Sequence, residues 1–173
     1  MPIIPDTKNW TWVLETPCPE CGYDASDYAD TDIAPAILRN AEPWPAVLAR
    51  PMARTRPDES TWSPLEYGAH VRDVFRTFGG RVDLMLSQDD PLFANWDQDA
   101  TAIEQRYNEQ DPSVVAVELA DAAAALANTY ESLEGPQWQR RGHRSDGADF
   151  TVASIGRYML HDIVHHVWDV TRP

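Results

Sequence analysis

Apolar residues recur at intervals of three and four along much of the chain, which is the period of an amphipathic helix. The clearest stretch covers residues 64–87, where valine, leucine, methionine and phenylalanine share one face. Ser63 is a suitable cap, Pro64 suits a first helical position, and Glu66 lies in the first turn. The pattern predicts one long helix here, with a bend or the close approach of another helix at Gly79-Gly80.

A preceding helix is expected to open near Thr31 or Asp32 and to run towards Leu48. Its second half contains Pro43 and Pro45. A proline inside a helix removes one backbone hydrogen bond and clashes with the turn before it. We therefore expect the helix to weaken or break at this point.

The second half of the chain predicts two more principal helices. Start signals at residues 111–113 precede an alanine-rich helix at 114–133, which Gly135-Pro136 would end. Thr151 is expected to start the last helix, which runs to about residue 170.

The connecting segments are predicted to be loops. Residues 89–98 and the polar, glycine-flanked stretch 137–150 show no sustained period, and a short helix is expected at 100–107. Nothing in the chain alternates for long enough to predict a sheet.

These elements indicate one domain over residues 1–173. Residues 1–30 are rich in turn-forming proline and acidic side chains, and we expect an irregular arm there, anchored by Trp10 and Trp12. The predicted fold is an all-α, antiparallel four-helix bundle with long connections and an irregular N-terminal arm.

The charge of the chain excludes two classes of partner. Lys and Arg total 14 against 28 for Asp and Glu, so the net charge is −14. Nucleic acids and anionic membrane surfaces both require a cationic footprint, and neither is expected as a partner. Residues 1–6 lack the basic start and apolar stretch of a signal peptide, which makes the cytoplasm the expected location.

Histidines in the last predicted helix carry the strongest chemical signal. His161 and His165 lie about 40° apart on a helix, one turn above the other, so their imidazoles can converge on one ion. They line the edge of the apolar stripe, with Tyr158 and Trp168 nearby. His70 lies in the middle of the long helix, and a bundle can project it into the same interior. The sequence predicts a metal site at His70, His161 and His165, although ordinary hydrogen-bonded histidines would show the same spacing.

Neighbouring polar residues are assigned lesser roles. His166 points about 100° away from His165 and is not expected to be a ligand. Asp162 can orient a ligand histidine from behind, or simply belong to a solvated acidic face. Glu66 and Tyr67 share the helical face of His70 and are expected near the pocket.

The two cysteines of the chain, Cys18 and Cys21, are separated by two residues. This spacing suits a reversible disulfide, half of a zinc site, or a reduced turn packed under the arm. No second cysteine pair exists to complete a four-cysteine site. We therefore do not place these residues in the predicted metal site.

Several segments resemble the DinB-like superfamily of metal-binding four-helix bundles, which includes mycothiol- and bacillithiol-dependent enzymes. They are WSPLEYGAHVRD at 62–73, RSDGADFTV at 144–152 and YMLHDIVHH at 158–166. The opening WTWVLE at 10–15 and CPECG at 18–22 are similar to a subgroup from mycothiol-producing bacteria. The resemblance implies the bundle fold and the same three histidines as metal ligands.

The resemblance also implies a function. Three neutral imidazoles leave a divalent ion with open positions, as in catalytic sites. We expect a thiol-dependent transferase or isomerase that uses mycothiol on a small electrophile. A hydrolase using metal-activated water and a non-catalytic metal-binding stress-response protein remain alternatives. Zinc is the expected ion, while nickel, iron and manganese also accept imidazole. Arg144 and Arg141 are candidates for binding an anionic group, and the family favours a homodimer. No catalytic residue is assigned.

Overall fold

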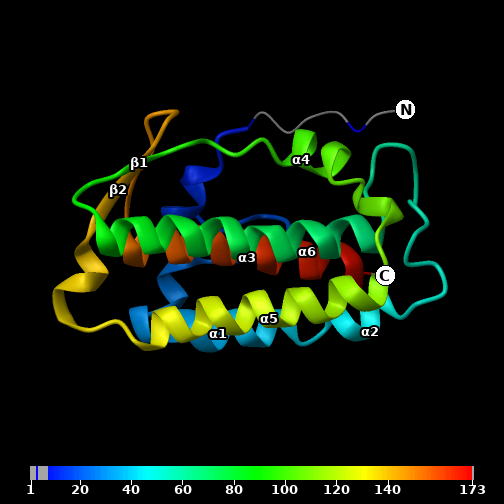
Figure 1. Cartoon of the computed structure of the whole chain (residues 1–173), viewed down its shortest axis with the longest axis horizontal. Helices are drawn as coiled ribbons and strands as arrows, with labels where there is room; N and C mark the ends of the chain where they lie inside the picture. The colour runs from blue at the N-terminus through cyan, green and yellow to red at the C-terminus, as the bar shows by residue number, and fades with distance from the viewer. Residues whose placement is uncertain (1–2, 4–7, 173) are drawn as a thin grey trace.

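Two layers of paired helices form the body of the protein (Figure 1). The structure, a computed structural model, describes residue 3 and residues 8–172. The prediction that residues 1–6 lack the features of a signal peptide therefore concerns a segment outside the described residues, except at Ile3. One layer holds α3 (Pro64–Ser87) and α6 (Val152–Thr171). The other holds α1 (Ile33–Ala41), α2 (Trp44–Leu48) and α5 (Pro112–Glu131).

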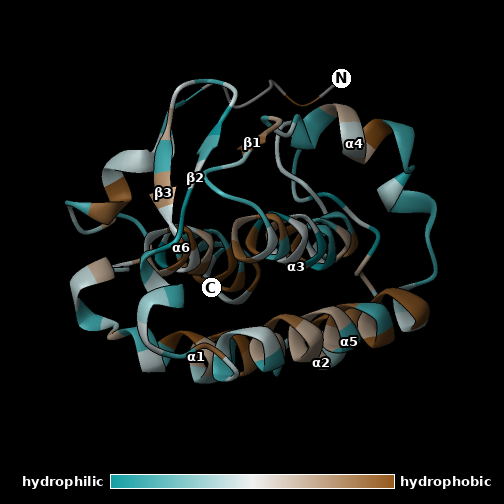
Figure 2. Cartoon of the chain, turned by 60° about the vertical axis from the view of Figure 1, so that its left-hand side comes forward, coloured by the Kyte–Doolittle hydropathy of each residue, from teal (hydrophilic) through white to brown (hydrophobic). Residues whose placement is uncertain are grey.

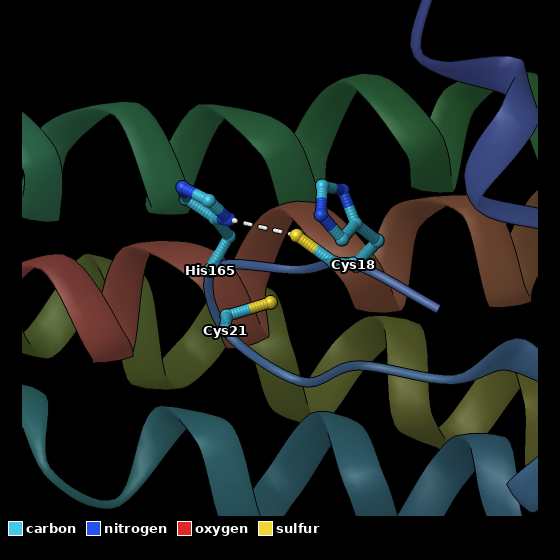
Figure 3. A group of neighbouring side chains, drawn as sticks. Cys18, Cys21 and His165 are labelled. Carbon is cyan, nitrogen blue, oxygen red and sulfur yellow. Dashed lines mark hydrogen bonds between the residues drawn. The ribbon is translucent and has the colours of Figure 1, made fainter. Parts of the chain in front are cut away.

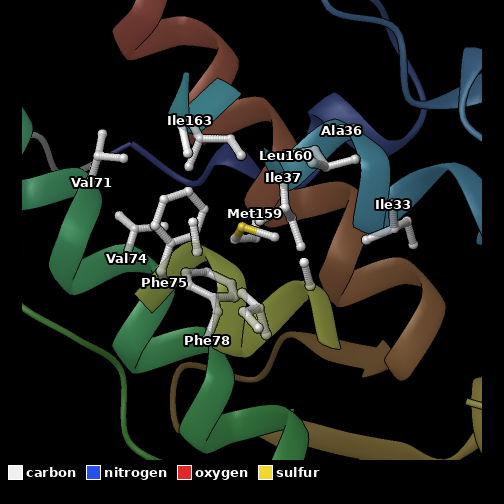
Figure 4. Close-up of a cluster of buried hydrophobic side chains, with 14 of the residues drawn as sticks. Ile33, Ala36, Ile37, Val71, Val74, Phe75, Phe78, Met159, Leu160 and Ile163 are labelled. Carbon is white, nitrogen blue, oxygen red and sulfur yellow. The ribbon is translucent and has the colours of Figure 1, made fainter. Parts of the chain in front are cut away.

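Four helices enclose the hydrophobic core, which confirms the predicted four-helix bundle. Helix α1 packs against α5 and α6, and α3 packs against the same two helices. Phe75 of α3, Ile37 of α1 and Met159 of α6 meet in the middle and are almost fully buried (Figure 4). Burying one such side chain contributes about 1.5–3 kcal/mol. Apolar burial between the two layers therefore holds α3 and α6 in place.

Helix α3 begins as the sequence predicts. The Ser63 hydroxyl accepts a hydrogen bond from the Glu66 backbone amide, and the Glu66 carboxylate accepts one from the Ser63 amide. Arg56 adds an ion pair to the same carboxylate. Burial raises the pKa of Glu66, but these partners outweigh it and hold the pKa below its usual value. Glu66 therefore helps to cap the N-terminus of α3.

The prolines and glycines act in different ways in these helices. The expected break before Leu48 is confirmed, because α1 ends at Ala41 and Pro43 caps the short helix α2. The expected bend at Gly79-Gly80 is not accompanied by any interruption of α3. A Cβ atom at Gly79 would make only an ordinary contact of 3.9 Å with Leu126 of α5.

The later helices lie close to their predicted positions. Asp111 caps α5 with its side chain, and Thr151 caps α6 in the same way. The short helix predicted at 100–107 is α4 (Gln98–Glu104), which is followed by a 3₁₀ turn at Tyr107–Glu109.

A three-stranded sheet replaces two of the predicted loops. Strand β2 (Arg141–Arg144) pairs in parallel with β1 (Leu92–Phe93) and antiparallel with β3 (Asp149–Thr151). It lies over α3 and α6, on the side away from α1 and α5, as the hydropathy-coloured view shows (Figure 2). A Cβ atom at Gly142 would lie 2.7 Å from Met85 Cγ, so glycine allows β2 to approach α3. Strands this short offer too few alternating positions to be recognised in the sequence.

The N-terminal arm lies along α6. It contains three short 3₁₀ helices, η1 (Trp10–Leu14), η2 (Ala25–Asp27) and η3 (Asp30–Asp32). The Tyr23 hydroxyl donates to the Arg157 carbonyl oxygen at 2.7 Å. Trp10 and Trp12 were the predicted anchors of the arm, but Trp12 is 36% exposed. Val13 and Cys18 are buried and therefore also anchor the arm.

No helix within residues 3 and 8–172 combines the length and the apolar character that crossing a membrane would require.

Two glycine substitutions test the packing of the bundle. A Cβ atom at Gly156 in α6 would lie 2.7 Å from the Tyr130 hydroxyl oxygen. We expect Gly156→Ala to lower the free energy of unfolding by about 1–3 kcal/mol, as overpacking does. Gly80→Ala is the matched control, because an added Cβ atom there meets nothing within 4 Å. It should stabilise α3 by about 0.4–1 kcal/mol. Urea unfolding measures both, and equal effects would contradict the packing described here.

Candidate metal centre

His70 lies in the second turn of α3, between α6 and the segments that carry Trp62 and Trp96. Its side chain is fully buried, and its ring stacks on Trp96 with centroids 5.4 Å apart. Trp62 covers it from another side at 5.2 Å. Its Nε2 atom lies 3.2 Å from Oδ1 of Asp162 in α6, while Nδ1 has no hydrogen-bond partner. The fold therefore aims one edge of this imidazole directly at α6.

Asp162 and His166 complete the first cluster. They are four residues apart on α6, and His166 Nε2 lies 3.2 Å from Asp162 Oδ1. Two imidazole nitrogens thus converge on one carboxylate oxygen. Tetrahedral ligand atoms about 2.0–2.2 Å from a zinc-type ion lie about 3.3–3.6 Å apart, so the two separations of 3.2 Å are close to those of ligands of one ion. His166 Nδ1 contacts Asp169 Oδ2 at 3.0 Å, which fixes the orientation of the ring.

The charges of this cluster depend on one another. Burial lowers the pKa of His70. Burial also opposes ionisation of Asp162, but His70 and His166 outweigh it and hold the Asp162 pKa far below its usual range. Burial likewise opposes the charged form of His166, yet hydrogen bonds to Asp162 and Asp169 raise its pKa to about 9. Without an ion, the cluster therefore holds one anionic carboxylate against one cationic imidazole.

A second cluster brings the N-terminal arm to α6. One ligand atom from each of Cys18, Cys21, His161 and His165 lies within 4.8 Å of the others. Burial lowers the pKa of His161 to about 4 and also lowers the pKa of His165, so both rings are neutral. Burial raises the pKa of the Cys21 thiol to about 11.

The two clusters divide the metal triad predicted from the sequence. Among the described residues, His70 is grouped with Asp162 and His166, while His161 and His165 are grouped with the cysteines. In the predicted site, His166 was not a ligand and Asp162 stood behind one, whereas in the structure both lie beside His70. A usable signal was present, because Asp162 and His166 have the same four-residue spacing as His161 and His165.

Two neighbouring cavities reach the first cluster. One, of about 260 Å³, is lined by Tyr67, His166 and Asp162, among others. The second, of about 410 Å³, is lined by Asp162, Tyr158 and residues of the loop before α4. Asp162 and Tyr158 line both cavities, His166 lines the smaller one, and His70 lies behind Asp162 and lines neither.

The larger cavity carries two buried guanidinium groups, Arg144 and Arg81. Arg144 forms a two-point ion pair with Asp146 and donates to the Tyr158 hydroxyl at 3.2 Å. Burial and the nearby Arg144 charge lower the pKa of Arg81 to about 10. An anionic or strongly polar ligand would find two fixed donors here. Arg141 is exposed on β2 and does not line this cavity.

The other predicted pocket residues lie at different distances from the cluster. The ring of Tyr67 lies 5.0 Å from that of His166. Trp168 packs against His165 at 5.3 Å, beside the second cluster. Glu66 faces the start of α3 and its Arg56 partner, and lines neither of the two cavities.

The fold belongs to a class that builds sites from inward-facing side chains of neighbouring helices. The sequence profile of the DinB superfamily matches residues 48–170, and the chain belongs to this superfamily. No curated protein sequence matches the chain.

One solved structure with the same architecture is YfiT from Bacillus subtilis, described as a probable metal-dependent hydrolase with an unusual four-helix bundle topology. The two proteins share 17% sequence identity, with a TM-score of 0.69 over 91% of this chain and 90% of YfiT. At this identity, the similarity establishes the fold alone.

The raised pKa of His166 predicts a pH dependence for the metal-free protein. Since the folded-state pKa of about 9 exceeds the ordinary 6.5, the folded protein holds a proton that the unfolded chain releases. The contribution of His166 to stability should therefore be complete below pH 6.5 and be lost as pH rises through about 9, whereas the lowered pKa values of His70, His161 and His165 act only below pH 6.5 and in the opposite direction. Urea unfolding against pH measures the slope, and nuclear magnetic resonance follows the ring itself. Asp169→Asn should lower the His166 pKa and flatten the slope, and an unchanged slope would contradict this assignment.

Proposed function

We propose that this protein is a metal-dependent enzyme that holds one divalent ion at His70, Asp162 and His166. The observation that carries the proposal is the convergence of both Nε2 atoms on Asp162 Oδ1, at 3.2 Å each, where two cavities adjoin. Three protein ligands leave open positions for a substrate, as in catalytic sites. His70 is retained from the sequence prediction, while Asp162 and His166 replace His161 and His165.

The donor set fits a dication. Two imidazoles and one carboxylate suit zinc, and nickel, iron and manganese also accept them. Asp169 accepts a hydrogen bond at the far nitrogen of His166, the arrangement in which a carboxylate orients a ligand histidine. When bound here, a dication would lower the pKa of a coordinated thiol or water molecule and so supply a nucleophile at neutral pH.

The surrounding residues have roles of their own. Trp62 and Trp96 cover the fully buried His70 ring, which keeps its orientation and excludes water from that side. Arg144 and Arg81 lie in the adjoining cavity and would bind carboxylate or hydroxyl groups of a ligand. Asp146 and Tyr158 fix the Arg144 guanidinium in place. A reactant would thus be held beside the ligands by its polar end.

We propose thiol-dependent transfer or isomerisation of a small electrophile as the reaction, with mycothiol as the thiol. The support is the resemblance to thiol-dependent superfamily members and a cavity of about 410 Å³ that offers polar groups to a hydrophilic cofactor. Hydrolysis is the second candidate, because the structural relative YfiT is described as a probable metal-dependent hydrolase.

Metal content tests the ligand assignment. We expect His70→Ala and Asp162→Asn each to lose one bound ion per chain relative to the wild type, as measured by elemental analysis after dialysis. Asp169→Asn should weaken the affinity for the ion by about 10–100-fold, as loss of an orienting carboxylate does. His143→Ala is the matched control, since His143 lies on β2 and belongs to neither cluster. Folded variants with wild-type metal content would overturn the assignment.

Thiol binding separates the two reactions. The Co²⁺ form is titrated with mycothiol, and the difference spectrum cancels any band from the chain's own cysteines. A new thiolate-to-cobalt band is expected in the wild type and not in the His70→Ala control. Consumption of an electrophile should then require the thiol. Hydrolysis of an ester or amide at the same rate without thiol, with no new band, would favour the hydrolase.

A further inference from the structure

A second group of ligand atoms lies where the N-terminal arm crosses α6. Both thiols and the His165 imidazole point towards one another in the gap between the two segments (Figure 3). Cys18 is 2% exposed and His161 is 5% exposed. We propose that Cys18, Cys21, His161 and His165 form a closed, four-ligand zinc site that is separate from the catalytic centre and fastens the arm to α6.

The turn at the cysteines is shaped to present both sulfur atoms on one side. The Gly22 amide donates to the Cys18 carbonyl oxygen at 3.0 Å, and the Cys18 amide donates to the Tyr23 carbonyl oxygen at 2.8 Å. Gly22 has a φ of 74°, which a residue with a side chain rarely adopts. A two-residue spacing of cysteines is typical of zinc sites.

Helix α6 supplies the other two ligands from successive turns. Cys18 Sγ lies 3.8 Å from His165 Nδ1. With a Zn–S distance of about 2.3 Å and a Zn–N distance of about 2.0–2.1 Å, tetrahedral ligands of these types lie about 3.6 Å apart. The observed distance is therefore close to that of two ligands of one ion. The rings of His161 and His165 lie 5.3 Å apart, next to each other on the helix.

His161 has a buried nitrogen that points to a missing partner. Its Nε2 atom has no hydrogen-bond partner, although the side chain is almost completely buried. Buried polar atoms are nearly always satisfied, because leaving one unpaired costs free energy. Coordination to an ion would satisfy this nitrogen.

Two carboxylates lie near the far nitrogen of the His165 ring. While Nδ1 faces Cys18, its Nε2 atom faces the carboxylates of Glu20 at 3.6 Å and Asp169 at 4.0 Å. These distances are longer than a hydrogen bond, so the two carboxylates act on the ring through their charge. The arm and α6 each provide one of these carboxylates.

The ligand types favour zinc and a structural role. Two thiolates balance the charge of a dication, so the complete site would be neutral, which suits two buried ligands, Cys18 and His161, and two partly buried ones, Cys21 and His165. A tetrahedral set of two sulfur and two nitrogen ligands is typical of zinc. Four protein ligands leave no position for a substrate, in contrast to the cluster at His70.

The site would also set one wall of the catalytic cavities. Trp10 stacks on His161 with ring centroids 5.4 Å apart, and it lines both cavities. Trp10 begins η1, eight residues before the first cysteine in the same arm. Binding zinc at His161 would therefore hold the arm and this indole in position.

The ion and its ligands are tested directly in the full-length His70→Ala chain, which lacks a ligand of the catalytic centre. Under reducing conditions it should bind one Co²⁺ per chain with a thiolate-to-cobalt band. X-ray absorption of its Zn²⁺ form should show two sulfur neighbours at about 2.3 Å. No bound ion, a shell without sulfur, or a Cys18–Cys21 disulfide in freshly purified protein would overturn the proposal.

Substitution of the cysteines provides the converse test. Cys18→Ser/Cys21→Ser should lose one ion per chain and keep the ion that depends on His70. Cys21→Ser alone leaves three ligands and should bind zinc at least 10-fold more weakly. Chelation should lower the melting temperature of the His70→Ala chain and have no such effect once the cysteines are also replaced. Wild-type metal content in the double variant, or loss of the His70-dependent ion instead, would overturn the proposal. A wild-type chain that binds only the cysteine-dependent ion would overturn the proposed function and leave this proposal standing.

Discussion

Helix α6 packs against α3, α1 and the N-terminal arm, and both ligand clusters depend on this packing. Helix α3 covers one side of it, and the N-terminal arm covers another. Because successive helical residues are about 100° apart, His161 and Asp162 cannot face the same partner. Asp162 faces His70 on α3, and His161 faces Cys18 on the arm. A small rotation of α6 about its axis would dismantle both clusters together.

Acidic side chains organise the histidines of α6. Asp169 lies 3.0 Å from His166 Nδ1 and 4.0 Å from His165 Nε2, so one carboxylate stands behind a ring of each cluster. This shared contact links the two clusters electrostatically. The net charge of −14 describes the chain as a whole, whereas the larger cavity contains the buried cations Arg81 and Arg144. Asp97, Asp99, Asp146 and Asp162 line the same cavity, so it offers a polar reactant both donors and acceptors.

Local signals were sufficient for most of the fold. The capping residues Ser63 and Thr151 mark helix starts in the sequence and make the expected hydrogen bonds in the structure. The sheet was missed because its strands have two to four residues and depend on Gly142 packing against Met85, a contact between distant parts of the chain. The sequence predicted that His70 would face α6 in the candidate metal site. It did not predict that Asp162 and His166 would be the residues of α6 beside it.

Helix α6 carries two pairs of candidate ligands with the same spacing, His161 with His165 and Asp162 with His166, and the sequence could not distinguish between them. Its spacing alone determined that His161 lies above His165 and that Asp162 lies above His166, since a helix has a fixed period. Both pairs satisfy that rule equally well. Only the tertiary structure decided which pair meets His70 and which meets the cysteine turn, because this choice depends on the rotation of α6 against α3 and the arm. That rotation is set by apolar burial across the whole bundle, which no local pattern contains.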